Sequence, residues 1–152
     1  MRSPAIYFLN TQGVFLLLAG VLLYLWYIEK SREEALHILI SSGLTTILVF
    51  LIKAIFAIPR PYQAYGLDAL AGYAVRTTSL PSLHAALAFC LAATVILHQK
   101  RFGVILFVAA AIIGFGRIAA HVHYPLDIVV GSILGAAVAL LTEELHFKRI
   151  RS

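Results

Sequence analysis

The stretch FGVILFVAAAIIGFGRIAA, residues 102–120, decides the fold, because Arg117 is the one charged residue in it. About 18–20 apolar residues in a helix cross the hydrocarbon core of a bilayer. Hydrophobic residues make up 61% of the 152-residue chain, and its mean hydropathy is +0.92. This composition excludes an ordinary soluble domain, and we expect an integral membrane protein.

Other apolar segments lie on both sides of this stretch, at residues 5–28, 35–58, 82–97 and 125–145. The alternation and regular turn signals of a β-barrel are absent, so helices must satisfy the backbone hydrogen bonds in lipid. We predict an all-α fold: a polytopic transmembrane helix bundle of about five membrane helices, with residues 1–152 as a single domain. A cleaved signal peptide is the alternative for residues 5–28. We expect a retained helix, because Arg2 is the only charge before it and no small-x-small site immediately precedes Glu29.

The polar stretch at residues 59–81 is the longest connection, and its length favours a segment that covers a site. The net charge of +5 does not indicate nucleic-acid binding, because most cations lie at segment ends or near the candidate site. Cys90, the single cysteine, excludes an intrachain disulfide.

Ionisable residues gather in three separated stretches at the ends of the apolar segments. Ionisable groups are costly there unless each has a partner or a function. Alternating crossings place the three stretches on one face of the membrane. Three permanent cations, two imidazoles and one carboxylate indicate an anionic substrate and acid–base or nucleophilic chemistry. These residues are Lys53 and Arg60, then His84, then Arg117, His123 and Asp127.

The third stretch is the most specific, because Asp127 follows His123 by one helical turn. A carboxylate there can accept from one imidazole nitrogen and leave the other free to attack. Asp127 can also simply stabilise a helix start, with His123 an interfacial histidine. Neither alternative accounts for Arg117.

The first two stretches each have a simpler alternative. Lys53 and Arg60 are seven residues apart and can share one helix face if the helix persists, but snorkelling and interfacial anchoring also explain them. Ser82 begins a helix, where its backbone N–H can bind phosphate and its hydroxyl can act as an N-cap.

Basic residues are unevenly distributed between the two faces. One face carries the loop and tail cations, and the other carries Arg2, Arg76 and the candidate site. The positive-inside rule then makes the carboxyl terminus cytoplasmic and the site extracytoplasmic, in a multi-pass protein of the cell membrane. The cytoplasmic set is Lys30, Arg32, Lys100, Arg101, Lys148, Arg149 and Arg151.

Three groups of these residues resemble the signature motifs of the type 2 phosphatidic acid phosphatase family, in order and spacing. They are Lys53 with Arg60-Pro61, then Ser79-Leu80-Pro81-Ser82-Leu83-His84, then Arg117 with His123 and Asp127. The resemblance covers about residues 53–127, which we take as the catalytic core. It implies that His123 is a nucleophile forming a phosphohistidine, Asp127 its orienting partner and His84 the general acid. It also implies that the phosphate is held by Lys53, Arg60, Ser82, the Leu83 backbone and Arg117, without metal or cofactor.

The chain departs from this family at three points. Leu83 stands where the family usually has glycine, so its side chain needs room beside the phosphate. Gly116 stands where a serine usually precedes the arginine of the third motif. Bacterial members usually have six helices, and here the first is missing or merged into the amino-terminal segment.

The resemblance favours a lipid phosphatase, with polyprenyl (undecaprenyl) diphosphate as the first substrate by analogy alone. Phosphatidate, phosphatidylglycerophosphate and a lipid A phosphate fit the same chemistry. A metalloenzyme or metal transporter using His84, His121, His123 and Asp127 is less favoured, because three neighbouring cations would repel the ion. A catalytically silent lipid-binding protein is the remaining alternative. The expected partners are membrane lipids, not nucleic acid, and the sequence does not set the oligomeric state.

Other features receive structural interpretations. Gly131 and Gly135 form a small-xxx-small pair suited to close packing within the bundle. His121 either lines the pocket or ends the fourth helix, and we leave it out of the catalytic set. His37, His98 and His146 are expected near the cytoplasmic face, and we assign them no role.

Overall fold

The computed structural model of the chain describes residues 4–67 and 78–150. Among these residues it contains helices and no strands. The helices are α1 (Pro4–Leu23), continued by the π-helical turn η1 (Tyr24–Ile28), then α2 (Arg32–Ile55), α3 (Pro61–Ala64), α4 (Leu83–His98), α5 (Lys100–Ala119) and α6 (Pro125–Ile150). The predicted all-α bundle and its five apolar segments are confirmed.

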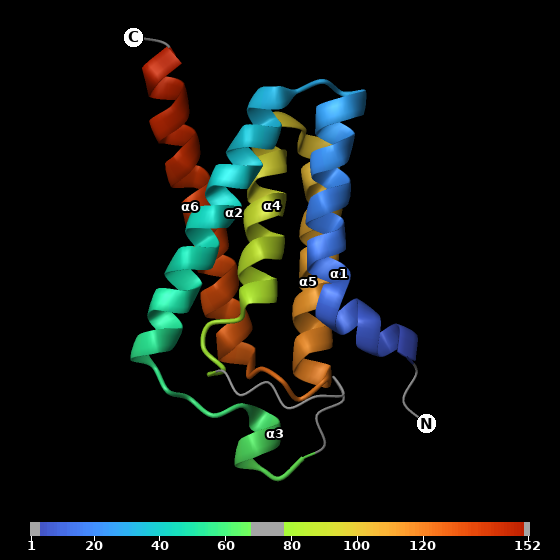
Figure 1. Ribbon diagram of the computed structural model, residues 1–152, viewed down its shortest axis with the longest axis vertical. Helices are drawn as coiled ribbons and strands as arrows, with labels where there is room; N and C mark the ends of the chain where they lie inside the picture. The colour runs from blue at the N-terminus through green and yellow to red at the C-terminus, as the bar shows by residue number, and fades with distance from the viewer. Residues whose placement is uncertain (1–3, 68–77, 151–152) are drawn as a thin grey trace.

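Helix α4 lies at the centre, and α2, α5 and α6 pack around it, with α1 beside α4 and α5 (Figure 1). Most of its residues are buried, and the buried ones are mostly small, which allows neighbouring helices to approach closely. A Cβ added at Gly131 would lie 2.7 Å from the Ser82 carbonyl oxygen, and one at Gly135 only 2.0 Å from that of Ala86. The two glycines therefore bring α6 against α4 within the bundle, as predicted.

The outer surface of the bundle is apolar. Large side chains such as Ile112, Phe115 and Leu141 point outward, and Phe115 is 73% exposed. A soluble monomer rarely exposes so much contiguous apolar surface. In a membrane protein, lipid covers such a surface. Within the described part of the chain, three segments are long and apolar enough to cross a membrane: α2, α5 and Pro125–Leu145 of α6. Gln12–Ile28 and α4 are shorter apolar helices.

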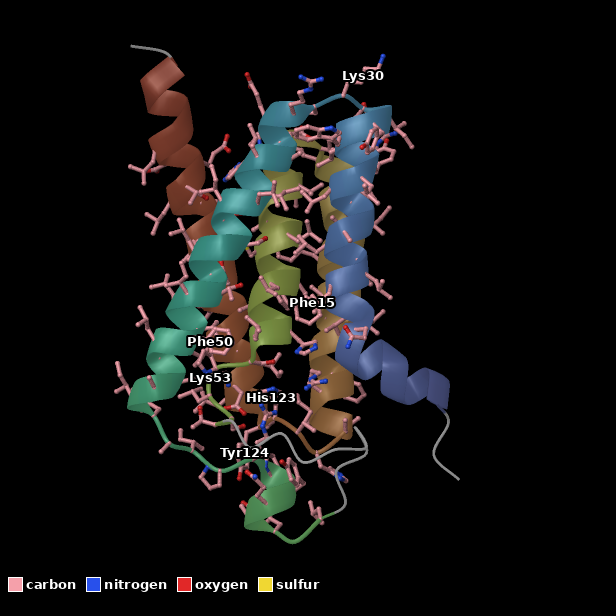
Figure 2. The ribbon with its side chains drawn as sticks, viewed as in Figure 1. Phe15, Lys30, Phe50, Lys53, His123 and Tyr124 are labelled. Atoms are coloured by element: carbon pink, nitrogen blue, oxygen red, sulfur yellow. The ribbon has the colours of Figure 1, made fainter. Side chains whose placement is uncertain are left out.

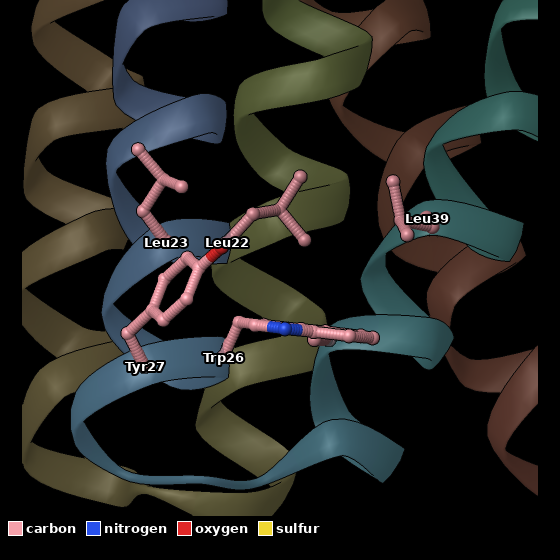
Figure 3. Close-up of a pocket in the computed structure, with 6 residues that line it drawn as sticks. Leu22, Leu23, Trp26, Tyr27 and Leu39 are labelled. Carbon is pink, nitrogen blue, oxygen red and sulfur yellow. The ribbon is translucent and has the colours of Figure 1, made fainter.

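One shallow apolar hollow of about 240 Å³ lies between the end of α1, η1 and the start of α2 (Figure 3). Its lining includes Trp26 and Tyr27, close to the connection that carries Lys30. Because Leu23, Tyr27 and Leu39 are themselves exposed, the hollow is part of the lipid-facing surface.

The connection between α2 and α4 corrects one expectation. Helix α2 ends at Ile55 rather than near residue 58, and Phe56 is already extended. Lys53 and Arg60 therefore do not share a helix face; Arg60 instead precedes α3, with Pro61 at its first position. Arg2, Arg76 and residues 68–77 of the expected covering segment lie outside the described residues.

Candidate active site

The three motif segments meet at one end of the bundle, opposite the loop that carries Lys30 (Figure 2). Lys53 is in the last turn of α2, His84 in the first turn of α4, and Arg117 in the last turn of α5. His123 lies in the turn between α5 and α6. The alternation of helix directions accounts for this arrangement.

The turn between α5 and α6 has the hydrogen bonds of a Schellman motif. The His121 N–H donates to the Ile118 carbonyl at 2.9 Å, and the Val122 N–H to the Arg117 carbonyl at 3.3 Å. His121 takes the left-handed conformation that this motif requires, with φ of 58°. His121 thus ends the helix, which is one of its two predicted roles, and the turn presents His123 at the start of α6.

Asp127 holds the ring of His123. Its Oδ2 lies 3.2 Å from His123 Nδ1 and accepts from the Tyr124 N–H at 2.8 Å. The Ser79 hydroxyl donates to the same oxygen. Because the carboxylate accepts only, Nδ1 carries the proton and Nε2 keeps its lone pair.

Arg60 approaches His123 from the opposite side. Its Nη1 donates to the Val122 carbonyl at 2.9 Å and lies 3.3 Å from His123 Nε2. Two contacts hold Arg60 there. The Gln63 side chain accepts from the Arg60 N–H at 3.1 Å, and the Tyr62 N–H donates to the His121 carbonyl at 3.1 Å. The ring of Tyr62 is buried with Ala120 and Val122, so α3 is fixed to the turn between α5 and α6.

The electrostatics keep His123 neutral at physiological pH. The pKa of His123 is lowered to about 4, mainly because burial disfavours the charged ring; the positive charges of Arg60 and Arg117 also lower it, and Asp127 raises it. His123 and Asp127 are 3% and 2% exposed, and both guanidinium groups are nearly as buried. The site thus combines an unprotonated imidazole nitrogen with buried positive charge, which suits attack on a phosphoryl group.

Lys53 contacts the segment that leads into α4. Its Nζ donates to the Thr78 carbonyl at 2.6 Å and to the Ser79 carbonyl at 3.2 Å. Because the Ser79 hydroxyl in turn bonds to Asp127, Lys53 is joined to the His123 pair through one residue. Sequence reasoning quoted Ser79 within a motif but did not include it among the site residues.

The start of α4 changes the expectation for Ser82. The Ser82 hydroxyl accepts from the Ala85 N–H at 3.4 Å, which is N-cap geometry, and the Ser82 N–H donates to the Asp127 carbonyl at 3.1 Å. The backbone N–H of Ser82 therefore already has a partner in this structure, and its binding to phosphate stays a prediction. The next N–H groups, of Leu83 and His84, precede the first intrahelical bond and are those a helix start offers to an anion.

His84 and Arg117 reach this end of the bundle through their helices. The ring of His84 meets the edge of Phe15 on α1, with ring centroids 5.6 Å apart. Arg117 is buried. No sequence signal indicated that Phe15 would contact a motif residue.

Residues 34–151 match the PAP2 superfamily. The chain belongs to this superfamily. The solved structure of *Aquifex aeolicus* LpxE superposes with a TM-score of 0.76 and 30% identity, covering 94% of this chain and 88% of that one. Bacitracin transport permease protein BcrC of *Bacillus licheniformis* is 29% identical, and undecaprenyl-diphosphatase BcrC of *Bacillus subtilis* is 28% identical. The two alignments cover 92% and 91% of this chain and 70% of each relative.

Leu83 stands where this superfamily usually has glycine, and the chain places its side chain in an apolar cluster rather than beside His123. The Leu83 side chain packs against the apolar cluster of Val14, Leu87, Ala88 and Ala110, between α1, α4 and α5. Its backbone N–H remains at the helix start. The expected crowding beside the phosphate is thereby reduced.

Proposed function

We propose that this chain is a membrane lipid phosphatase whose phosphate site is the end of the bundle around His123. The observation that carries the proposal is the orientation of one buried imidazole: Asp127 binds Nδ1, and Arg60 lies beside Nε2. The family assignment supports the same chemistry. In this proposal residues 1–152 are one phosphatase domain with its catalytic core at about residues 53–127.

The first half of the proposed reaction transfers the phosphoryl group to the protein. The lone pair of His123 Nε2 forms a bond to phosphorus, and the bond from phosphorus to the leaving oxygen breaks. His84 gives its proton to that oxygen, and Asp127 stabilises the positive ring of the phosphohistidine. Arg60 turns its N–H groups from Nε2 to the phosphoryl oxygens, which frees the lone pair.

The second half regenerates the enzyme. A water molecule attacks phosphorus while the now neutral His84 takes its proton, and the bond from phosphorus to Nε2 breaks. Inorganic phosphate leaves, and both histidines return to their starting states. Arg117, Lys53 and the first N–H groups of α4 bind the charge that develops on the phosphoryl oxygens.

We assign polyprenyl diphosphate, with an undecaprenyl chain, as the substrate. The name of the *Bacillus subtilis* relative and the location of the site at the end of a membrane bundle support this choice. Transport, named for the *Bacillus licheniformis* relative, is less favoured, because the close contact of α4 and α6 leaves little room for a path between them. We also infer an extracytoplasmic site and a cytoplasmic carboxyl terminus from the distribution of basic residues.

Phosphate release in detergent from a panel of lipids tests the function. We expect undecaprenyl diphosphate to give the highest kcat/KM, with undiminished rates in excess EDTA, because the residues at the site supply the charge that a metal would. Highest activity on phosphatidate, phosphatidylglycerophosphate or a lipid A phosphate would replace the substrate but keep the mechanism. Lipid binding without turnover would identify a silent lipid-binding protein. Complete loss of activity in EDTA from protein that remains folded, restored by metal at the His123 site, would contradict the mechanism.

A further inference from the structure

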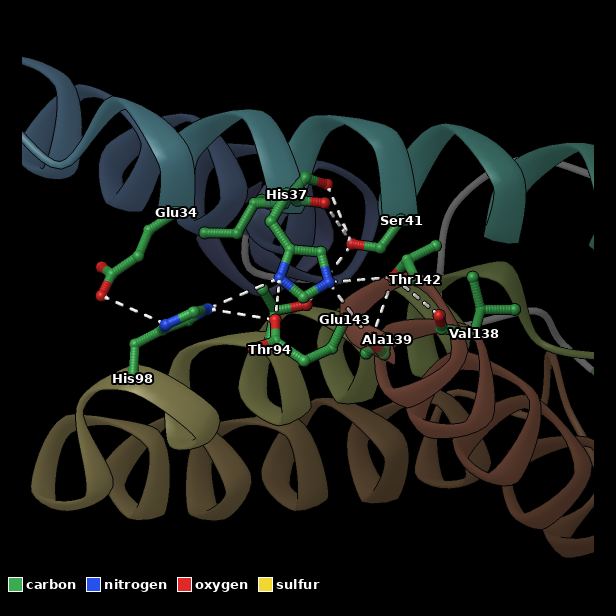
Figure 4. A network of polar contacts seen from close by, with 10 residues as sticks. Glu34, His37, Ser41, Thr94, His98, Val138, Ala139, Thr142 and Glu143 are labelled. Carbon is green, nitrogen blue, oxygen red and sulfur yellow. Dashed lines mark hydrogen bonds and ion pairs between the residues drawn. The ribbon is translucent and has the colours of Figure 1, made fainter. Parts of the chain in front are cut away.

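A second polar cluster, partly buried, lies at the end of the bundle opposite the candidate active site. It joins His37 on α2, His98 at the end of α4 and Glu143 on α6 (Figure 4). Sequence analysis placed His37 and His98 near the cytoplasmic face and assigned them no role. In the structure one nitrogen or oxygen atom from each points to a common space.

The three atoms form a triangle of metal-ligand dimensions. His37 Nδ1 lies 2.8 Å from Glu143 Oε2, His98 Nε2 lies 3.4 Å from the same oxygen, and the two nitrogens are 3.5 Å apart. Ligand atoms around a tetrahedral zinc ion, with bonds of about 2.0–2.2 Å, lie roughly 3.3–3.6 Å apart. A small rotation of the Glu143 side chain brings the shortest side into that range.

The outer contacts of His37 fix its tautomer. Its Nε2 lies 3.2 Å from the Ala139 carbonyl and 2.9 Å from the Thr142 hydroxyl oxygen. The Thr142 hydroxyl already donates to backbone carbonyls, so it accepts from His37. Nε2 therefore carries the proton, and in a neutral ring the lone pair of Nδ1 faces the Glu143 carboxylate. Two lone pairs 2.8 Å apart repel unless a cation lies between them.

His98 has the same arrangement in a looser form. Its Nδ1 lies 3.8 Å from Glu34 Oε1, which leaves Nε2 facing the triangle. A carboxylate or carbonyl on the outer nitrogen is the usual support of a metal-binding histidine. Glu34 is itself held by the Gln99 amide at 3.1 Å.

The charge of the cluster also favours a cation. When both imidazoles are neutral, the histidines do not balance the negative charges of the two carboxylates, Glu34 and Glu143. Among the residues whose side chains the structure describes, up to Leu145, no ion pair joins a lysine or arginine to either carboxylate. Glu143 Oε2 is buried, and within the described residues it accepts no hydrogen bond of good geometry.

We propose that His37, His98 and Glu143 bind one divalent transition-metal ion of the zinc class. Two imidazole nitrogens and one carboxylate oxygen suit Zn²⁺ better than Mg²⁺ or Ca²⁺, which prefer oxygen ligands alone. The ion ties α2, α4 and α6 together and keeps its fourth position for water. It is distant from His123 and takes no part in phosphoryl transfer.

Cobalt binding to the full-length protein in detergent tests the proposal. After removal of metals with a chelator and dialysis, we expect one equivalent of Co²⁺ to bind with the visible absorption of a four-coordinate site, and Zn²⁺ to displace it. His98→Ala and Glu143→Gln should each abolish this absorption. Glu144→Gln, at the neighbouring exposed carboxylate, and His123→Ala should retain it.

Thermal unfolding gives a second measurement, because an ion that binds only the folded state raises the midpoint. Zn²⁺ should raise the midpoint of the metal-free wild type and of Glu144→Gln, but not that of Glu143→Gln. Wild-type protein that takes up no Co²⁺, or Co²⁺ binding that survives Glu143→Gln and disappears in His123→Ala, would overturn the proposal. If the wild type takes up no Co²⁺, the positive charge between His37 and Glu143 is a proton on His37 and not a metal ion. Because the readout is metal binding, the result is independent of the proposed phosphatase function.

Discussion

Asp127 connects the second and third motif segments. Its carboxylate accepts from Ser79, His123 and the Tyr124 backbone, and its carbonyl accepts from the Ser82 N–H. An acceptor with so many donors is held in one position, so the His123 tautomer is set before substrate arrives. His84 has a different environment, against Phe15 at a helix start. The two histidines are therefore chemically unequal.

This inequality predicts different failures for the two alanine variants. His84→Ala loses protonation of the leaving oxygen, which costs about 10²–10⁴-fold for a lipid substrate. The loss should shrink with p-nitrophenyl phosphate, whose leaving group departs without a proton. His123→Ala should give neither phosphate release nor labelled protein from a radiolabelled substrate. Rescue of His123→Ala instead of His84→Ala by the better leaving group would show that the roles are reversed.

The lowered pKa of His123 predicts that the imidazole remains a nucleophile at mildly acidic pH. With a pKa of about 4 instead of about 6.5, the imidazole is neutral above about pH 4. The neutral, nucleophilic form is lost only as the pH falls through that value. From pH 7.5 to pH 5.5, kcat/KM should fall less than twofold once rates are corrected for substrate ionisation. An unshifted histidine would lose about tenfold. An acid limb near pH 6.5 would contradict the assignment of His123 as a buried neutral base.

At the scale of elements, the end of α5 positions the site. His121 is a non-glycine residue in left-handed backbone, and the Val122 carbonyl that follows it accepts from Arg60. The Tyr62 N–H bonds to the His121 carbonyl itself. The Schellman turn thus determines how closely Arg60 approaches His123.

This geometry makes His121→Gly a stabilising change and His121→Val a damaging one. Glycine relieves a left-handed strain of about 1–2 kcal/mol, and a β-branched residue increases it. We expect a higher unfolding midpoint and retained kcat/KM for His121→Gly, and both reduced for His121→Val. Loss of activity in His121→Gly with a raised midpoint would assign the imidazole a direct part in the reaction.

Sequence reasoning succeeded where the signal is local or follows from helix order. Hydropathy fixed the apolar segments, and alternate crossings placed Lys53, His84 and His123 at one end. It did not predict that α2 stops at Ile55 or that Lys53 bonds to the Thr78 carbonyl, because contacts between residues far apart in the sequence leave no local signal. The backbone bond that occupies the Ser82 N–H was missed for the same reason. The roles of the site residues remain predictions.

The whole molecule has two chemically different polar ends joined by an apolar bundle. One end holds buried arginines around His123, and the other holds histidines and glutamates with the loop cations at its edge. Small residues between α4 and α6 keep the bundle closed between them. The orientation of these ends in the membrane determines which compartment supplies substrate.

Cysteine labelling tests that orientation. Cys90 is buried and is replaced by alanine to give a cysteine-free background. Tyr65, 69% exposed at the site end, becomes one probe as Tyr65→Cys, and Glu33→Cys and Arg149→Cys report on the opposite end and the tail. In intact cells a membrane-impermeant maleimide should label Tyr65→Cys alone, because the basic loops and tail favour the cytoplasm. A permeant maleimide should label all three, which shows that each is reactive. The reverse pattern, with only the Glu33 and Arg149 probes labelled from outside, would place the His123 site in the cytoplasm, where it could not act on a diphosphate presented at the outer surface.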